Sequence, residues 1–232
     1  MKLGILKADD VRPELVGEFG EYSDMVANVM LAIDPGLHIQ VYDVYHGQYP
    51  SHIDEVDIYA VTGSKCSVYD QLDWIFQLTE FVQQLHQARK KFVGICFGHQ
   101  MIAHALGGKA EKSAKGWGVG VQTYFATPAG QAQGLAPRFE LKVSHQDQVT
   151  SLPEGSQLLA ANDFCPNAMF KLDDHILSLQ GHPEFSKAYM QGLLPLREEQ
   201  LGSALMNQAL QSLAIETHDK DVNQVIYNFL NA

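Results

Sequence analysis

A cysteine lies between two glycines in the middle of the chain, in the segment Gly94-Ile95-Cys96-Phe97-Gly98-His99-Gln100. The segment follows an apolar run and precedes a helical pattern, as in a nucleophile elbow, where the reactive residue occupies a cramped turn from strand to helix. Gly94 and Gly98 would leave room for this turn. The thiol would then face a helix N-terminus, whose dipole favours the thiolate. Cys96 is therefore a candidate nucleophile, although the same spacing also suits a tight turn with an inert, buried thiol.

A second motif, Gln180-Gly181-His182-Pro183-Glu184-Phe185, follows another strand-like run at residues 176–179. A cysteine nucleophile needs a base, and the base needs an orienting partner. Pro183 disfavours helix for the residue before it, so the side chains of His182 and Glu184 can share one face of an extended segment. The pair is thus a candidate base and orienting carboxylate for Cys96.

Together the two motifs resemble those of the class I, or triad, glutamine amidotransferases, whose catalytic domain carries G-x-C-x-G-x-Q and a later H-P-E. The resemblance implies that Cys96 is the nucleophile, His182 the base and Glu184 its orienting partner. Two further landmarks lie at residues 61–64 and 144–147, and the whole set is similar to that of free-standing proteins related to the amidotransferase domain of GMP synthetase. No family landmark follows residue 187 or so.

The resemblance also implies donors for the charge that develops on the reacting carbonyl oxygen. In an elbow, one donor is the backbone N–H of the residue after the nucleophile, here Phe97. The second donor would come from the turn at Gly63 and Ser64. Members of the family usually have two glycines in this turn, so the serine leaves open which of the two amides points inward.

Substrate would be held by two segments that match the family. Gln100 would contact the bound glutamyl group, and Ser144, His145 and Gln146 would hold its amino and carboxylate ends, largely through the backbone. Taken without the resemblance, Gln100 suits a solvent-facing helix position and the other three residues suit a polar loop. We expect no metal site, because the histidines at positions 99 and 104 do not have the i, i+4 spacing of helix-borne ligands. We also expect no cofactor.

Alternating strand and helix patterns predict an α/β fold that is flavodoxin-like, with a mostly parallel central sheet and helices on both faces. Strands are expected at 2–7, 38–44, 57–61 and 92–95, with helices at 22–33, 70–89 and 99–106. Shorter strand-like runs at 118–126, 140–143, 158–161, 168–171 and 176–179 predict a small antiparallel extension. Residues 187–232 look helical, and we expect one domain over 1–232.

Composition narrows the classes of partner. The formal charge of −11 argues against nucleic acid and anionic membranes, which require a basic surface. No apolar run approaches the roughly 20 residues of a membrane span, and the first apolar run is too short for a signal peptide. Three cysteines without C-x-x-C spacing suit reduced thiols, so a cytoplasmic location is expected.

These features give three hypotheses for function. The first, implied by the resemblance, is hydrolysis of the side-chain amide of glutamine to glutamate and ammonia through a glutamyl thioester, with a synthetase subunit as a possible partner. The second is a free-standing γ-glutamyl peptidase, which the absence of a P-loop or other synthetase motif favours. The third is a noncatalytic binding module of the same fold, which a broken triad would indicate, although all three residues are present here.

Overall fold

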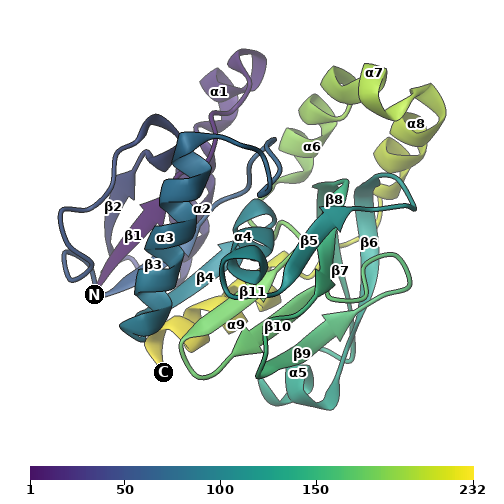
Figure 1. Cartoon of the computed structure of the whole chain (residues 1–232). Coiled ribbons are helices and arrows are strands. Elements are labelled where there is room, and N and C mark those ends of the chain that lie inside the picture. Colours follow the sequence, from purple (N-terminus) through teal and green to yellow (C-terminus); the bar gives the residue numbers. More distant parts are fainter.

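The computed structural model describes residues 1–232, which are built around a nine-stranded sheet of order β2-β1-β3-β4-β11-β10-β9-β6-β7 (Figure 1). The first five strands in this order pair in parallel: β2 (His38–Tyr42), β1 (Lys2–Leu6), β3 (Ile58–Val61), β4 (Lys91–Ile95) and β11 (Ile176–Leu179). Four strands continue the sheet in antiparallel fashion: β10 (Met169–Leu172), β9 (Ser156–Ala161), β6 (Gly118–Ala126) and β7 (Arg138–His145). A separate antiparallel pair consists of β5 (Lys109–Lys112) and β8 (Asp147–Ser151).

Helices cover both faces of the parallel strands (Figure 1). On one face, Val26 of α2 (Tyr22–Ile33) and Val222 of α9 (Asp219–Asn231) belong to the same buried cluster as Ile5 of β1. On the other face, α3 (Asp73–Gln87) and α4 (Phe97–Ala105) pack in a second cluster with Tyr59 and Phe92. The parallel strands have the order of a flavodoxin-like sheet. The predicted fold class is therefore confirmed.

Several predicted boundaries agree with the structure, most others differ by one or two residues, and two differ for a clear reason. The helix at 22–33 and the strands at 118–126 and 176–179 have the predicted limits. The strand predicted to reach residue 44 ends at Tyr42, because Asp43 turns its carboxylate to Lys7, 2.8 Å away, and Val44–His46 form a 3-10 turn, η1. The helix predicted at 70–89 is shorter, and the chain leaves it at Arg89 with a φ of 53°. Phe76 on this helix is 48% exposed, although its spacing matches that of the buried residues of the helix.

Short elements escape the sequence patterns, notably α1 (Pro13–Phe19), α5 (Pro128–Ala132), β5 and β8. The last part of the chain is helical as predicted, with α6 (Lys187–Leu193), η2 (Pro195–Arg197), α7 (Glu198–Leu201) and α8 (Ser203–Ser212) before α9. Leu15 and Tyr22 near the N-terminus pack with Tyr189 and Met206 of this part in a third buried cluster. No helix has the length and apolarity that crossing a membrane requires.

The parallel strands place three short segments at one edge of the sheet. Gly63 follows β3, Cys96 follows β4 and His182 follows β11, each within three residues of the carboxyl end of its strand. In open α/β sheets this is the edge at which ligands bind. The topology therefore brings together residues that are far apart in the sequence.

Candidate active site

Cys96 occupies the sharp turn between β4 and α4, with φ 52° and ψ −100°. A non-glycine residue in this region is strained by about 1–3 kcal/mol and needs support from its surroundings. The support includes hydrogen bonds from the Cys96 N–H to the Leu179 carbonyl (2.9 Å) and from the Gln100 N–H to the Cys96 carbonyl (3.1 Å). Cys96 thus has the backbone geometry of a nucleophile elbow.

The two glycines of the elbow are required by close backbone approach. A Cβ on Gly94 would lie 2.4 Å from the carbonyl oxygen of Gly98, and a Cβ on Gly98 would lie 2.5 Å from that of Val61. Both distances are too short for any side chain. The space that the sequence pattern predicted beside these two glycines is therefore filled by neighbouring backbone.

His182 and Glu184 form a buried pair beside this turn. Nδ1 of the imidazole lies 2.7 Å from Oε1 of the carboxylate, and both residues are less than 9% exposed. The backbone N–H of His182 donates to the Lys142 carbonyl at 2.8 Å, and the side-chain amide of Asn223 on α9 donates to the Pro183 carbonyl at 2.9 Å. These bonds fix the extended segment on which the two side chains share a face.

The His182 ring is also placed by its neighbours above and below. It stacks on Phe185 with a centroid distance of 3.9 Å and an interplanar angle of 5°. A Cβ on Gly63 would lie 3.1 Å from Cε1 of His182 and 3.7 Å from Cβ of Cys96, so Gly63 borders both side chains. The Cys96 side chain is close enough to His182 to contribute to the raised pKa of the imidazole.

Electrostatics favour a charged imidazole in this setting. Burial lowers the pKa of His182, but the Glu184 carboxylate and the neighbouring Cys96 outweigh that effect and raise it well above its ordinary value of 6.5. A proton on His182 therefore persists at neutral pH. An imidazolium beside a cysteine favours the thiolate.

Three backbone amides near the sulfur have no acceptor within the chain, those of Gly63, Ser64 and Phe97. The next two amides along the turn are satisfied, since Lys65 donates to Asp9 at 2.8 Å and Cys66 donates to the Ser64 hydroxyl at 3.1 Å. Free amides at this edge have the character of an oxyanion site.

A chain of amide side chains reaches the sulfur from the other side. Gln180 donates from Nε2 to the Cys96 sulfur at 3.4 Å, and its Oε1 accepts from Gln100 Nε2 at 3.1 Å. Gln100 also donates to the Asp147 carbonyl at 2.7 Å and is only 3% exposed, so it is not a solvent-facing helix residue. Sequence reasoning did not identify Gln180 as part of the site, because its two partners come from other elements.

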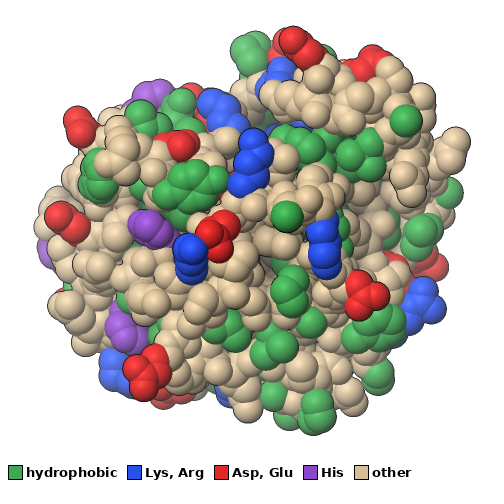
Figure 2. Space-filling view, turned by 45° about the vertical axis from the view of Figure 1, so that its right-hand side comes forward, with side chains coloured by type: hydrophobic (Ala, Val, Ile, Leu, Met, Phe, Trp, Pro, Cys, Tyr) green, Lys and Arg blue, Asp and Glu red, His purple; other side chains and the backbone are tan.

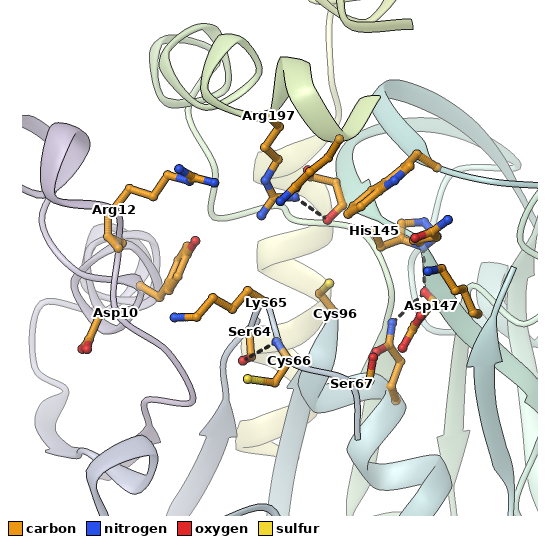
Figure 3. A pocket seen from close by; sticks show the side chains of 18 of the residues that line it. Asp10, Arg12, Ser64, Lys65, Cys66, Ser67, Cys96, His145, Asp147 and Arg197 are labelled. Carbon is orange, nitrogen blue, oxygen red and sulfur yellow. Dashed lines mark hydrogen bonds between the residues drawn. The ribbon is translucent and has the colours of Figure 1, made fainter. Parts of the chain in front are cut away.

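A cavity of about 620 Å³ opens over Cys96 (Figure 3). Its wall includes the predicted residues Ser64, Gln100, Ser144, His145 and Gln146. The remaining predicted residues, Gly63, Phe97, His182 and Glu184, are not part of this wall.

Residues that the sequence analysis did not assign also line the cavity. Nη1 of Arg197 donates to the Ser144 hydroxyl at 2.6 Å, and the guanidinium lies 5.8 Å from the ring centroid of Trp117. Val11, Arg12 and Tyr22 also line the cavity. Sequence patterns did not predict that these residues line the cavity. Arg197, for example, comes from the helical stretch that has no family landmarks.

His145 and His99 are buried and electrically neutral. Burial lowers the pKa of His145 to about 4 and that of His99 to about 3. Nδ1 of His145 lies 2.9 Å from the Asp147 carbonyl and Nδ1 of His99 lies 2.6 Å from the Ser178 hydroxyl. His104 is exposed, so His99 and His104 do not share a ligand site.

One group of potential metal ligands lies elsewhere, at Asp10, Asp43 and His46. The ammonium of Lys7 lies 2.6 Å from Asp10 Oδ1 and 2.8 Å from Asp43 Oδ2. These carboxylates therefore already share a cation that the chain itself supplies.

Comparisons with known proteins agree with this geometry. The profile of the class-I glutamine amidotransferase family matches residues 36–196. The chain is 33% identical over 193 residues to γ-glutamyl peptidase 3 of Arabidopsis thaliana, covering 79% of this chain and 76% of that protein. It is 33% identical over 196 residues to a glutamine amidotransferase-like protein of Schizosaccharomyces pombe, covering 79% of each. The chain therefore belongs to the class-I glutamine amidotransferase family.

Two further similarities are more distant. A GMP synthase of Porphyromonas gingivalis is 30% identical over 145 residues, which are 61% of this chain and 28% of that protein. The crystal structure of a glutamine amidotransferase from Thermotoga maritima superposes with a TM-score of 0.77 at 16% identity, covering 100% of this chain and 98% of that one. The second similarity establishes the same fold.

Proposed function

We propose that this chain is a cysteine hydrolase of γ-glutamyl amide bonds, in which Cys96 is the nucleophile, His182 the general acid and base, and Glu184 the group that orients and charges His182. The observation that carries the proposal is the buried His182–Glu184 pair, with its 2.7 Å contact, beside a cysteine held at positive φ. Strain and a raised histidine pKa are typical of sites built for chemistry.

The reaction follows from these groups. The Cys96 thiolate adds to the γ-carbonyl carbon, and the carbon–nitrogen bond breaks as the proton of His182 passes to the leaving nitrogen. A water molecule then gives a proton to the same imidazole and attacks the thioester, and the carbon–sulfur bond breaks. Glutamate leaves, and the proton and the sulfur are restored to their starting state.

Charge on the carbonyl oxygen is stabilised by amides that are already in place. The Phe97 N–H and an amide from the Gly63-Ser64 turn supply the donors, which is supported by their lack of any other acceptor. Removal of one such donor typically costs about 10²- to 10³-fold in turnover. Gln180 assists in the resting state, because its amide donates to the sulfur and favours the thiolate.

The glutamyl group carries an ammonium and a carboxylate, and the cavity offers opposite charges for them. Gln100, Ser144, His145 and Gln146 surround the place we propose for this group. Arg197 supplies a positive charge on that wall through its contact with Ser144. Asp147 supplies a negative one, and its Oδ2 is buried without a hydrogen-bond partner.

Two leaving groups fit the same chemistry. With glutamine, ammonia leaves and could pass to a synthetase subunit. With a γ-glutamyl peptide, an amino acid or peptide leaves. The second is favoured by the extent of the cavity beyond Cys96 toward Val11 and Tyr22, and by the similarity to a protein named γ-glutamyl peptidase. In either case we propose that the chain acts as one catalytic domain, in the cytoplasm and without a cofactor.

Glutamate release by the purified chain tests the proposal, with glutamine and γ-glutamyl dipeptides as parallel substrates. The proposal predicts turnover of at least one class, lost on Cys96→Ala without loss of folding. Activity on dipeptides alone would reject the glutaminase form. No turnover of either class would reject catalysis by the isolated chain and favour a binding module.

A further inference from the structure

The cavity over Cys96 has two sides, and only one of them is accounted for by the glutamyl group. His145 and Asp147 lie on one side of Cys96, and Arg12 and Lys65 lie on the other (Figure 3). A cavity of about 620 Å³ is within the usual range for sites that enclose a small molecule of several functional groups. The second side is therefore free to contact the group that leaves.

The position of His182 shows which side the leaving group must occupy. His182 stacks on Phe185, and Phe185 stacks in turn on Tyr22 with a centroid distance of 6.0 Å. Tyr22 lines the cavity together with Val11 and Arg12. Since His182 must protonate the leaving nitrogen, that nitrogen and its substituent lie toward the wall formed by these residues.

Arg12 carries a charge that no acidic side chain of the protein neutralises. The neighbouring carboxylates are engaged elsewhere, because Asp9 pairs with Lys65 at 2.6 Å and Asp10 pairs with Lys7 at 2.6 Å. Lys65, on the same side, is thereby already neutralised. Arg12 is thus a free cation of this wall, in a chain whose formal net charge is −11.

The backbone around Arg12 is held in place, so its guanidinium is presented from a defined point. The Arg12 carbonyl accepts from the N–H groups of Leu15 and Val16 at 2.8 and 3.0 Å. The preceding N–H, of Val11, donates to Glu21 Oε2 at 2.9 Å. On the face shown in Figure 2, lysine and arginine side chains are interspersed with acidic ones and form no large patch of one sign.

We infer that the wall around Arg12 is a leaving-group subsite, and that Arg12 selects γ-glutamyl compounds whose leaving amine carries a carboxylate. A guanidinium and a carboxylate form strong charge-assisted hydrogen bonds, often two at once. Glutamine loses only ammonia and gains nothing from this subsite. The inference rests on the proposed hydrolysis of γ-glutamyl bonds and names the substrate class within it: γ-glutamyl amino acids and peptides.

A matched pair of substrates isolates the charge. γ-Glutamylglycine and γ-glutamylglycinamide have the same γ-glutamyl bond and nearly the same size, but only the first has a carboxylate on its leaving group. The wild type is expected to prefer the first by about tenfold in kcat/KM, which corresponds to one partly exposed charged hydrogen bond. Arg12→Gln removes the preference by slowing the first substrate alone, and Arg12→Lys restores part of it.

Arg138→Gln is the control, because it removes one positive charge from an exposed side chain that pairs with Glu140 and does not line the cavity. It should keep the preference. Equal rates for the two substrates in the wild type, or an equal loss on both in Arg12→Gln with normal thermal unfolding, would overturn the subsite. If the wild type hydrolysed neither glutamine nor either of the two γ-glutamyl compounds, the proposed function itself would be overturned. The failure of the subsite and the failure of the proposed function are therefore distinguishable.

Discussion

Nδ1 of His182 lies 2.7 Å from Oε1 of Glu184, and both side chains are shielded from solvent. The contact fixes the imidazole so that its other nitrogen is left for the sulfur and the substrate. It also reverses the effect of burial on the imidazole, since Glu184 and Cys96 together raise the pKa of His182 above 6.5. The orientation and the charge of His182 therefore both depend on the Glu184 carboxylate.

Glu184→Gln keeps the shape of the side chain and removes its charge. We expect kcat/KM to fall by about 10²-fold or more, because the imidazole loses its orientation and its proton. Only Cys96 then opposes the effect of burial, so the pKa of His182 falls and the basic limb of the pH–rate profile moves to lower pH. Steady-state kinetics across pH measure both effects, and Glu154→Gln, at an exposed position, is the control.

The same pair gives a prediction for stability. A raised histidine pKa stabilises the folded state fully below the unfolded value of 6.5, and this stabilisation is lost as the pH rises through the folded value, about 10. The difference in unfolding free energy between wild type and Glu184→Gln should therefore be largest below pH 6.5 and shrink above it. A difference that grows with pH would contradict the assignment of charge.

Gln180 is the residue that donates to the sulfur, so its replacement should affect the chemical step. In Gln180→Leu the volume is nearly kept, and Gln100 retains its bond to the Asp147 carbonyl. We expect kcat to fall by about tenfold, the value of one hydrogen bond to a charged group, with KM nearly unchanged. An unchanged kcat would show that the 3.4 Å contact has no part in the reaction.

Gly94→Ala tests the close packing of the elbow. Its Cβ would meet the Gly98 carbonyl oxygen at 2.4 Å, and neither backbone can move without distorting the turn at Cys96. We expect a loss of about 1–3 kcal/mol in the free energy of unfolding. Gly17→Ala on α1 is the matched control, since its Cβ would meet nothing within 4 Å and the change should stabilise the helix by about 0.5–1 kcal/mol. Denaturant titration separates the two.

Acid sensitivity should depend on the buried His99. Burial holds its pKa near 3, whereas the unfolded chain takes up the proton near 6.5. Stability is therefore complete above pH 6.5 and is lost progressively as the pH falls toward 3. His99→Gln should flatten this dependence without abolishing it, because His145, with a pKa of about 4, acts in the same direction. His38→Gln, at an exposed position, should leave the slope unchanged.

Regular patterns with clear stop signals were predictable from the sequence. The helix at Tyr22–Ile33 ends where Asp34-Pro35-Gly36 interrupts it, and β11 is a buried, mostly apolar run just before the H-P-E motif. The short α1 and the pair β5 and β8 were not predicted, because too few residues carry a period. Their limits depend on tertiary packing rather than on local preference.

In the candidate site, the segments that could be predicted are those with a required residue type at fixed spacing, namely the G-x-C-x-G elbow and the H-P-E segment. Gln180, Arg197 and Arg12 were not predicted, because Gln180 and Arg197 contact residues remote in sequence and Arg12 is placed only by the cavity that it lines. Gln100 shows that local sequence can also suggest the wrong environment. Taken without the family resemblance, its helix position suggested exposure to solvent, but Asp147 of β8 and Gln180 cover its side chain.

The central claim is that Cys96 carries the glutamyl group during the reaction. Acid quenching of the enzyme during turnover of a γ-glutamyl dipeptide, followed by peptide mapping by mass spectrometry, tests this claim most directly. We predict a glutamyl adduct on Cys96 alone, because burial raises the pKa of both other thiols, Cys66 and Cys165, and disfavours their thiolates. An adduct on either of these residues with Cys96 unmodified, or hydrolysis that continues in Cys96→Ala, would contradict the account.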